Sequence, residues 1–260
     1  MQLVDIGANL THPAFREDLQ EVLTRARAAK VGTIIVTGTT IAESEVAGKL
    51  ADEHPDILYA TCGVHPHHAR DCDEATIPAL RELAGHRRMV AIGECGLDFN
   101  RNYLPHPDQE KWFVAQVELA CDLGKPLFLH SRDAFPRFTE ILRQYKIPKA
   151  VAHCFTGEKA ELHSYLDLGL YIGITGWICD ERRGAHLLEL AREIPRDRLL
   201  LETDSPYLTP RDLQPRPKTR RNEPAFLPHI VRTVARALGR PADEVAEQTT
   251  RNARALFGLS

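Results

Sequence analysis

Five polar residues in this sequence each close a short apolar run, and together they could bind a divalent cation. The runs ILYATCGVH, MVAIGE, PLFLH, AVAH and LLLETD end at His65, Glu94, His130, His153 and Asp204. Imidazole nitrogens and carboxylate oxygens form a mixed donor set that suits a divalent metal. A single histidine at a strand end is more often a hydrogen-bonded structural residue, but a carboxylate that ends an apolar run needs a partner or a cation. Five such endings predict one shared metal site.

The apolar runs themselves are typical of buried parallel strands, and amphipathic stretches with apolar residues about every 3.6 positions lie between them. Strands are expected at 3–9, 32–38, 57–65, 89–94, 126–130, 150–153, 170–175 and 199–204, and helices include 41–53, 108–123, 135–145, 158–168 and a last one from near Pro241.

This alternation predicts an α/β fold, a single (β/α)8 TIM-type barrel domain over residues 1–260 with an extra C-terminal helix. A doubly wound open sheet is the alternative, but no glycine-rich nucleotide-binding loop follows any of the runs. In a barrel the carboxyl ends of all strands meet at one mouth, so the five polar residues should converge there.

Composition excludes few functions. The 260 residues carry 33 basic and 36 acidic side chains, a net charge of −3, so polyanion binding requires a local patch. The six cysteines are dispersed, no CxxC pair or signal peptide is present, and no apolar run approaches the roughly 20 residues of a membrane span. We expect a cytoplasmic monomer with no membrane contact and no obligate protein partner.

Several longer motifs resemble one known family in order and spacing: AIGECGLDFNRN, PLFLHSRDAF, HCFTG, YIGITGWICDERRG, ETDSPYLTPRD and RRNEP. From Asp5 to about Phe257 the chain resembles the TatD family of metal-dependent deoxyribonucleases, which are amidohydrolase-like barrels. The resemblance implies hydrolysis of DNA, with 3′-5′ exonuclease action on single strands and RNA as a further substrate.

The resemblance also implies roles for individual residues. Glu94, His130, His153 and Asp204 match positions that bind one or two divalent cations, and Asp204 would also hold the attacking water. His65 matches a histidine near the scissile phosphate, so Asp204, Glu94 and His65 form the expected catalytic set. A bound cation would activate water and polarise a phosphoryl oxygen.

Ligand preferences leave the metal open between Mg²⁺, which the family favours, and Mn²⁺ or Zn²⁺. Most relatives carry an H-x-H pair on strand one, where this chain has Gly7 and Asn9, and His12 lies past the strand in a turn before Pro13. One of the two cation positions therefore lacks nitrogen ligands from strand one and is expected to bind its cation weakly. Because fewer imidazoles remain, the site should favour Mg²⁺ or Mn²⁺ over zinc. Glu202, two residues before Asp204, should point into the barrel and either orient a ligand or make a structural hydrogen bond.

The loops after strands seven and eight are basic and could hold phosphates, although charged runs are usually solvated. Aromatic residues near the mouth, Phe155, Trp177 and Tyr207, could stack on bases or belong to the barrel rim. Arg221 and Glu223 can instead pair with each other, or Glu223 can cap the next helix. The substrate-binding candidates are Asn9, His65, Arg182, Arg183, Arg211, Arg221 and Tyr207, with Arg216, Lys218 and Arg220 in the same loop.

Two other functions fit the same residues. An amidohydrolase-like esterase or amidase, such as an aminoacyl-tRNA deacylase, would use the same activated water, and a barrel with a weakened metal site could bind nucleic acid or protein without catalysis. Asp98, Arg132 and Asp133 occur in the motifs without a clear chemical task and are left out of the catalytic set.

Overall fold

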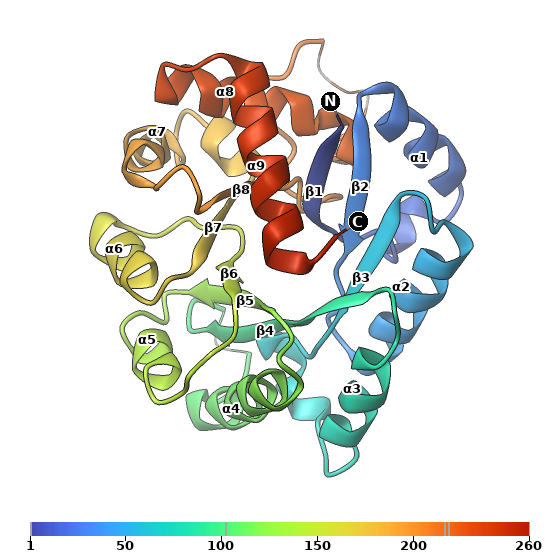
Figure 1. Cartoon of the computed structure of the whole chain (residues 1–260), viewed down its shortest axis with the longest axis vertical. Coiled ribbons are helices and arrows are strands. Elements are labelled where there is room, and N and C mark those ends of the chain that lie inside the picture. Colours follow the sequence, from blue (N-terminus) through green and yellow to red (C-terminus); the bar gives the residue numbers. More distant parts are fainter. Residues whose placement is uncertain (1, 102, 216, 218, 260) are drawn as a thin grey trace.

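The sheet of this protein is an eight-stranded parallel barrel, seen end-on in Figure 1. The computed structural model describes residues 2–101, 103–215, 217 and 219–259. Neighbouring strands follow the chain order from β1 to β8, as in a (β/α)8 TIM-type barrel, which confirms the predicted fold. The strands are β1 Leu3–Ala8, β2 Val31–Val36, β3 Leu58–Cys62, β4 Met89–Asp98, β5 Leu127–Arg132, β6 Ala150–Ala152, β7 Tyr171–Ile174 and β8 Leu199–Leu201.

The barrel closes between β1 and the segment after β8, at the carboxyl ends of the strands. The backbone N–H of Asp204 donates to Gly7 O at 2.8 Å, and that of Asn9 donates to Ser205 O at 2.7 Å. A parallel bridge pairs Ala8 with Ser205. The seam that completes the barrel therefore also fixes the backbone of Asp204 next to Asn9.

Helices alternate with the strands and surround the barrel (Figure 1). They are α1 Leu19–Ala28, α2 Ile41–Glu53, α3 Thr76–Ala84, α4 His106–Leu123, α5 Arg137–Leu142, α6 Lys159–Asp167, α7 Ala185–Leu190, α8 Leu227–Leu238 and α9 Ala242–Phe257. Short 3-10 helices occur at Pro13–Phe15 (η1), Pro66–Asp71 (η2), Gly176–Cys179 (η3), Ala191–Glu193 (η4) and Pro224–Phe226 (η5).

The extra helix α9 seals one end of the barrel. Leu256 and Phe257 of this helix pack in one buried cluster with Val4, Phe128 and Leu200 from the strands. Figure 1 shows α9 lying across the opening of the barrel. Burial of a Leu or Phe side chain contributes about 1.5–3 kcal/mol, so this floor is a substantial part of the core. The mouth with the polar strand ends lies at the other end.

Three strand ends differ from the predicted ones by three or more residues. β3 ends at Cys62 and β8 at Leu201, so His65 and Asp204 follow their strands at a distance of three residues. β4 instead continues past Glu94 to Asp98, because its pairing with β5 shifts register between Ile92 and Cys95 and then resumes. A bulge of this kind re-aims side chains, and here it lets one strand supply two carboxylates to the site.

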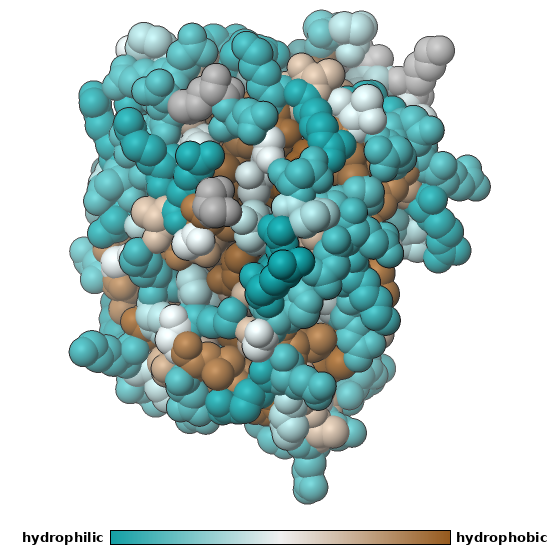
Figure 2. Space-filling view, turned by 45° about the vertical axis from the view of Figure 1, so that its right-hand side comes forward, coloured by the Kyte–Doolittle hydropathy of each residue, from teal (hydrophilic) through white to brown (hydrophobic). Residues whose placement is uncertain are grey.

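The outer surface is mainly polar. On the face shown in Figure 2, hydrophilic side chains cover most of the surface, and hydrophobic residues show in the recesses between them. Among the described residues the exposed large hydrophobic side chains are Val46, Tyr103 and Tyr207. None of the described helices combines the length and the hydropathy that crossing a bilayer requires.

Candidate active site

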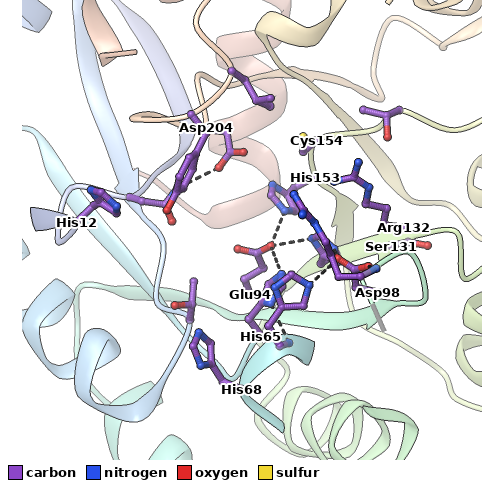
Figure 3. A pocket seen from close by; sticks show the side chains of 18 of the residues that line it. His12, His65, His68, Glu94, Asp98, Ser131, Arg132, His153, Cys154 and Asp204 are labelled. Carbon is purple, nitrogen blue, oxygen red and sulfur yellow. Dashed lines mark hydrogen bonds and ion pairs between the residues drawn. The ribbon is translucent and has the colours of Figure 1, made fainter. Parts of the chain in front are cut away.

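Three histidine rings converge on one carboxylate oxygen at the mouth of the barrel. Glu94 Oε1 lies 2.8 Å from His153 Nε2, 3.0 Å from His130 Nδ1 and 3.3 Å from His65 Nε2. Figure 3 shows Glu94, His65 and His153 turned toward one another, with Asp204 across the cavity. The structure thus brings together all five residues that close the predicted strands, in one cavity of about 580 Å³.

A network of backbone contacts holds this cluster in place. The N–H of Glu94 donates to Gly38 O at 2.8 Å, and the N–H of His153 donates to Leu129 O at 2.9 Å. His65 caps η2, because its Nδ1 accepts the N–H of His67 at 3.1 Å. That bond turns Nε2 of His65 toward Glu94. The ring orientation therefore follows from the turn that ends β3.

Asp98 supports His130 from the side opposite Glu94. Asp98 Oδ2 lies 2.7 Å from His67 Nε2 and 3.4 Å from His130 Nε2, while Oδ1 accepts the N–H groups of Asn100 and Arg101 at 3.0 and 2.9 Å. The carboxylate is buried. An acidic group behind a histidine fixes which ring nitrogen faces a metal, so Asp98 has a structural task that the sequence did not reveal.

Glu202 supports His153 in the same manner. Its Oε2 lies 3.4 Å from His153 Nδ1, and its Oε1 accepts the N–H of Cys154 at 2.6 Å. Both predicted roles of Glu202 are therefore present, a contact to a candidate ligand and a buried structural hydrogen bond. With a carboxylate behind each ring, Nδ1 of His130 and Nε2 of His153 are left facing Glu94.

Asp204 is positioned by Asn9. The Nδ2 group of Asn9 donates to Asp204 Oδ1 at 3.0 Å and to Ser205 O at 3.3 Å. Asp204 has a φ of 54°, in the left-handed region that non-glycine residues seldom adopt. The closing seam described above fixes this backbone. Strand one thus contributes a side chain that orients Asp204, in place of the imidazoles expected of relatives.

Burial and mutual contact shift the pKa values of the cluster strongly. Burial alone would raise the pKa of Glu94, but His153 and His65 hold it well below its usual range. Burial would lower the pKa of His153, but the Glu94 and Glu202 carboxylates raise it well above 6.5. Burial lowers the pKa of His65 to about 4 and raises that of Asp204 to about 7. Such opposed shifts are typical of functional sites.

The donor set fits a divalent cation. His65, Glu94 and His130 each offer a ligand atom, and these atoms lie within 4.8 Å of one another. His130 and His153 are both backed by carboxylates, an arrangement typical of metal-binding histidines. Glu94 provides the anionic charge that a cation requires. Glu94, His130 and His153, rather than strand one, form the core of the candidate metal centre, and the Nε2 of His65 is left as a donor because its Nδ1 accepts the N–H of His67.

The predicted substrate residues divide into two groups. Asn9, His65, Arg183 and Tyr207 line the cavity. Arg182, Arg211 and Arg221 are absent from its described lining and lie in ion pairs: Arg182 Nε is 3.6 Å from Asp180, Arg211 is 3.2 Å from Glu181, and Arg221 is 2.7 Å from Asp18. Their contact with substrate stays a prediction, and Arg216 and Lys218 lie outside the described residues.

Other predicted contacts differ in detail. Glu223 pairs mainly with Arg25 at 2.8 Å and only at 3.8 Å with Arg221, and it makes no side-chain cap of η5. Trp177 lines the cavity, whereas Phe155 is buried and packs in the core. Further residues line the cavity without having been singled out as substrate contacts, among them His67, Arg101, Tyr103 and Arg132.

Comparison with known proteins assigns the family. The sequence model described as "TatD related DNase" matches residues 4–258. The chain belongs to this family. It is 52% identical over 259 residues to the protein named "3'-5' ssDNA/RNA exonuclease TatD" of Pantoea ananatis, covering 99% of this chain and 100% of that one. A protein of the same name from Erwinia tasmaniensis is 55% identical with the same coverage.

Solved structures of TatD proteins share the fold. A TatD homologue from Escherichia coli superposes with a TM-score of 0.90 at 28% identity, covering 99% of this chain and 98% of that one. A TatD family hydrolase from Entamoeba histolytica gives a TM-score of 0.90 at 26% identity, again covering 99% and 98%. Membership in the TatD-related DNases agrees with the resemblance seen in the sequence motifs and makes this chain a metal-dependent hydrolase of the nuclease type.

Proposed function

We propose that this protein is a 3′-5′ exonuclease that hydrolyses single-stranded DNA and RNA. The observation that carries the proposal is the convergence of His65, His130 and His153 on Glu94 inside the cavity of a TatD-family barrel. The relatives at 52% and 55% identity bear names with this activity. Nearly full-length coverage of both chains supports the transfer.

In this proposal Glu94, His130, His153 and Asp204 hold the cation. When bound, it supplies charge that polarises a phosphoryl oxygen and favours ionisation of a water molecule. Asp98 and Glu202 hold the two histidine rings, so the ligand nitrogens are oriented before substrate arrives. Asn9 binds Asp204 Oδ1, and the second carboxylate oxygen of Asp204 accepts the proton of the attacking water. His65 donates to the scissile phosphate.

The proposal also covers the metal, the oligomeric state and the location of the protein. We propose Mg²⁺ as the cation, because Asn9 and Gly7 provide no imidazole from strand one and carboxylates suit Mg²⁺. The protein would act as a single-domain monomer in the cytoplasm.

Degradation of a 5′-labelled single-stranded oligonucleotide tests the function. With Mg²⁺ the protein should shorten the labelled strand from its 3′ end, and Glu94→Ala and Asp204→Asn should each lower the rate at least about 100-fold, as loss of a metal ligand does. Asp133→Asn is a matched control, because Asp133 pairs with Asn100 at the surface. Hydrolysis of aminoacyl-tRNA in preference to the oligonucleotide, or binding of single strands without turnover under any divalent metal, would contradict the proposal.

A further inference from the structure

The basic groups that line the cavity all lie on one side of it. Arg101 follows β4, Arg132 ends β5, and Arg183 lies between η3 and α7. The described lining contributed by β1, β2 and β8 contains no lysine or arginine. It consists of Asn9, Thr11, His12, Thr39, Glu43, Asp204, Tyr207 and Leu208. The arginines of the described lining therefore lie between β4 and β7, on the same side as Glu94 and Asp98, and the opposite side carries none.

Two of these arginines are available for a ligand. Among the described residues, neither Arg101 nor Arg132 forms an ion pair with a carboxylate, whereas Arg183 lies 3.0 Å from Asp180. The indole ring of Trp177 is near two of the guanidinium groups, with Arg183 4.4 Å and Arg132 5.9 Å from its centroid. An unpaired arginine at a cavity wall is well suited to a phosphate, which it can bind bidentately.

Exposed aromatic rings stand on both sides of the cavity. Tyr207 is 51% exposed, and its ring centroid lies 5.6 Å from that of His12 in an edge-to-face contact. Tyr103 is 56% exposed, and its ring centroid lies 4.8 Å from that of His67. β4 and β8 lie four strands apart in an eight-stranded barrel, so the two tyrosines stand across the mouth from each other. Both rings line the cavity, where a base can stack on them.

We propose that Arg101, Arg132 and Arg183 form a track for the phosphates on the 5′ side of the scissile bond, and that the 3′-terminal nucleoside lies against Tyr207. This inference rests on the proposed 3′-5′ exonuclease function. The 3′-terminal nucleoside carries no phosphate beyond the scissile one, so its side of the cavity needs no cation. All remaining phosphates lie upstream, where the three arginines are. Tyr103, next to Arg101, then stacks on an upstream base.

A length series of oligonucleotides tests the track. In an Asp204→Asn background with Mg²⁺, unlabelled dT2, dT4 and dT10 compete with 5′-fluorescein-dT10, and anisotropy measures their binding. Arg101→Gln and Arg132→Gln should weaken dT10 roughly five- to tenfold and dT2 less than about twofold, and each should lower the salt slope by about 0.7. Tyr103→Ala should show the same length dependence, and Tyr103→Phe should restore binding.

Two controls separate this inference from other effects. Arg196→Gln removes the same charge at the opposite end of the barrel, where Arg196 lies 3.4 Å from Glu244, and should not change the binding of any oligonucleotide. Tyr207→Ala should weaken all three lengths equally. Equal losses for dT2 and dT10 in the arginine variants would overturn the track. Because binding is measured without turnover, absence of exonuclease activity would contradict the proposed function and leave the length series a valid test.

Discussion

The carboxylate of Glu202 occupies the space that a side chain at position 7 would need. A Cβ atom added to Gly7 would lie 2.4 Å from Glu202 Oε2 and 3.0 Å from Phe128 Cζ. Glu202 itself is buried and fixed by the N–H of Cys154. Strand one therefore carries glycine here because a buried acidic group, committed to His153, already fills the position.

Gly7→Ala should destabilise the protein by about 1–3 kcal/mol, because the added methyl group overpacks a buried site. Thermal unfolding of the variant measures the loss. The penalty should fall in a Glu202→Ala background, where the space is open, so a double-mutant cycle isolates the contact. Equal penalties in both backgrounds would show that Glu202 is not the obstacle.

Asn9→His should not raise the affinity for zinc. One imidazole at position 9 cannot make a two-nitrogen site while position 7 is glycine, and the substitution removes the hydrogen bond to Asp204. Isothermal titration with Zn²⁺ and Mn²⁺ checks this expectation. Zinc binding as tight as that of a relative with a histidine pair, in either the parent protein or the variant, would contradict our account of strand one.

Asp98→Asn should weaken divalent metal binding about 10- to 100-fold, as loss of a carboxylate behind a metal-binding histidine does. The asparagine oxygen can still accept the N–H groups of Asn100 and Arg101, so the fold should persist. Manganese titration followed by calorimetry gives the affinity, and circular dichroism checks the fold. Asp133→Asn, at an exposed position paired with Asn100, should bind manganese like the parent protein.

Asp5 should make stability depend on pH. Burial raises the pKa of Asp5 from 3.8 to about 7, although Thr203 donates to both of its oxygens. A raised pKa in the folded state means that the stabilising contribution is complete below about pH 4, falls as pH rises, and is lost above about pH 7. Over this range the free energy of unfolding falls by at most about 4 kcal/mol.

Melting temperatures of the parent protein and Asp5→Asn between pH 5 and 9 measure this effect. The variant cannot ionise, and its oxygen can accept the N–H of Thr203, so it should gain stability relative to the parent as pH rises. Parallel melting curves across this range would mean that Asp5 does not titrate there.

The barrel and the core of the site were predictable because both depend on local patterns. Apolar runs and 3.6-residue periodicity revealed eight strands, and polar residues at the ends of those runs pointed to Glu94, His130 and Asp204. Alternation counted back from Asp204 placed Glu202 in the barrel correctly, although β8 itself ends at Leu201. Strand ends were less accurate, because His65 belongs to the turn that caps η2 rather than to β3.

Asp98, Arg101 and Arg132 could not be found in this way. The strand was expected to end at Glu94, whereas β4 runs on to Asp98, so the sequence did not place Asp98 four positions further along the same strand and beside His130. Arg101 and Tyr103 reach the cavity through the loop after β4, and loop conformation has no periodic signal. The one hint that the sequence offered was that Asp98 belongs to a motif and has no evident chemical task.

Because α9 forms the floor of the barrel, the interior becomes dry only when the last helix of the chain has docked. During synthesis Val4, on the first strand, stays exposed until Leu256 and Phe257 have emerged and packed against it. A chain interrupted before α9 would leave apolar side chains open to solvent and to proteases, whatever the state of its strands. A tag or fusion partner attached after α9 would lie close to this floor and could disturb its docking. The mouth with the candidate active site, at the other end of the barrel, would be undisturbed.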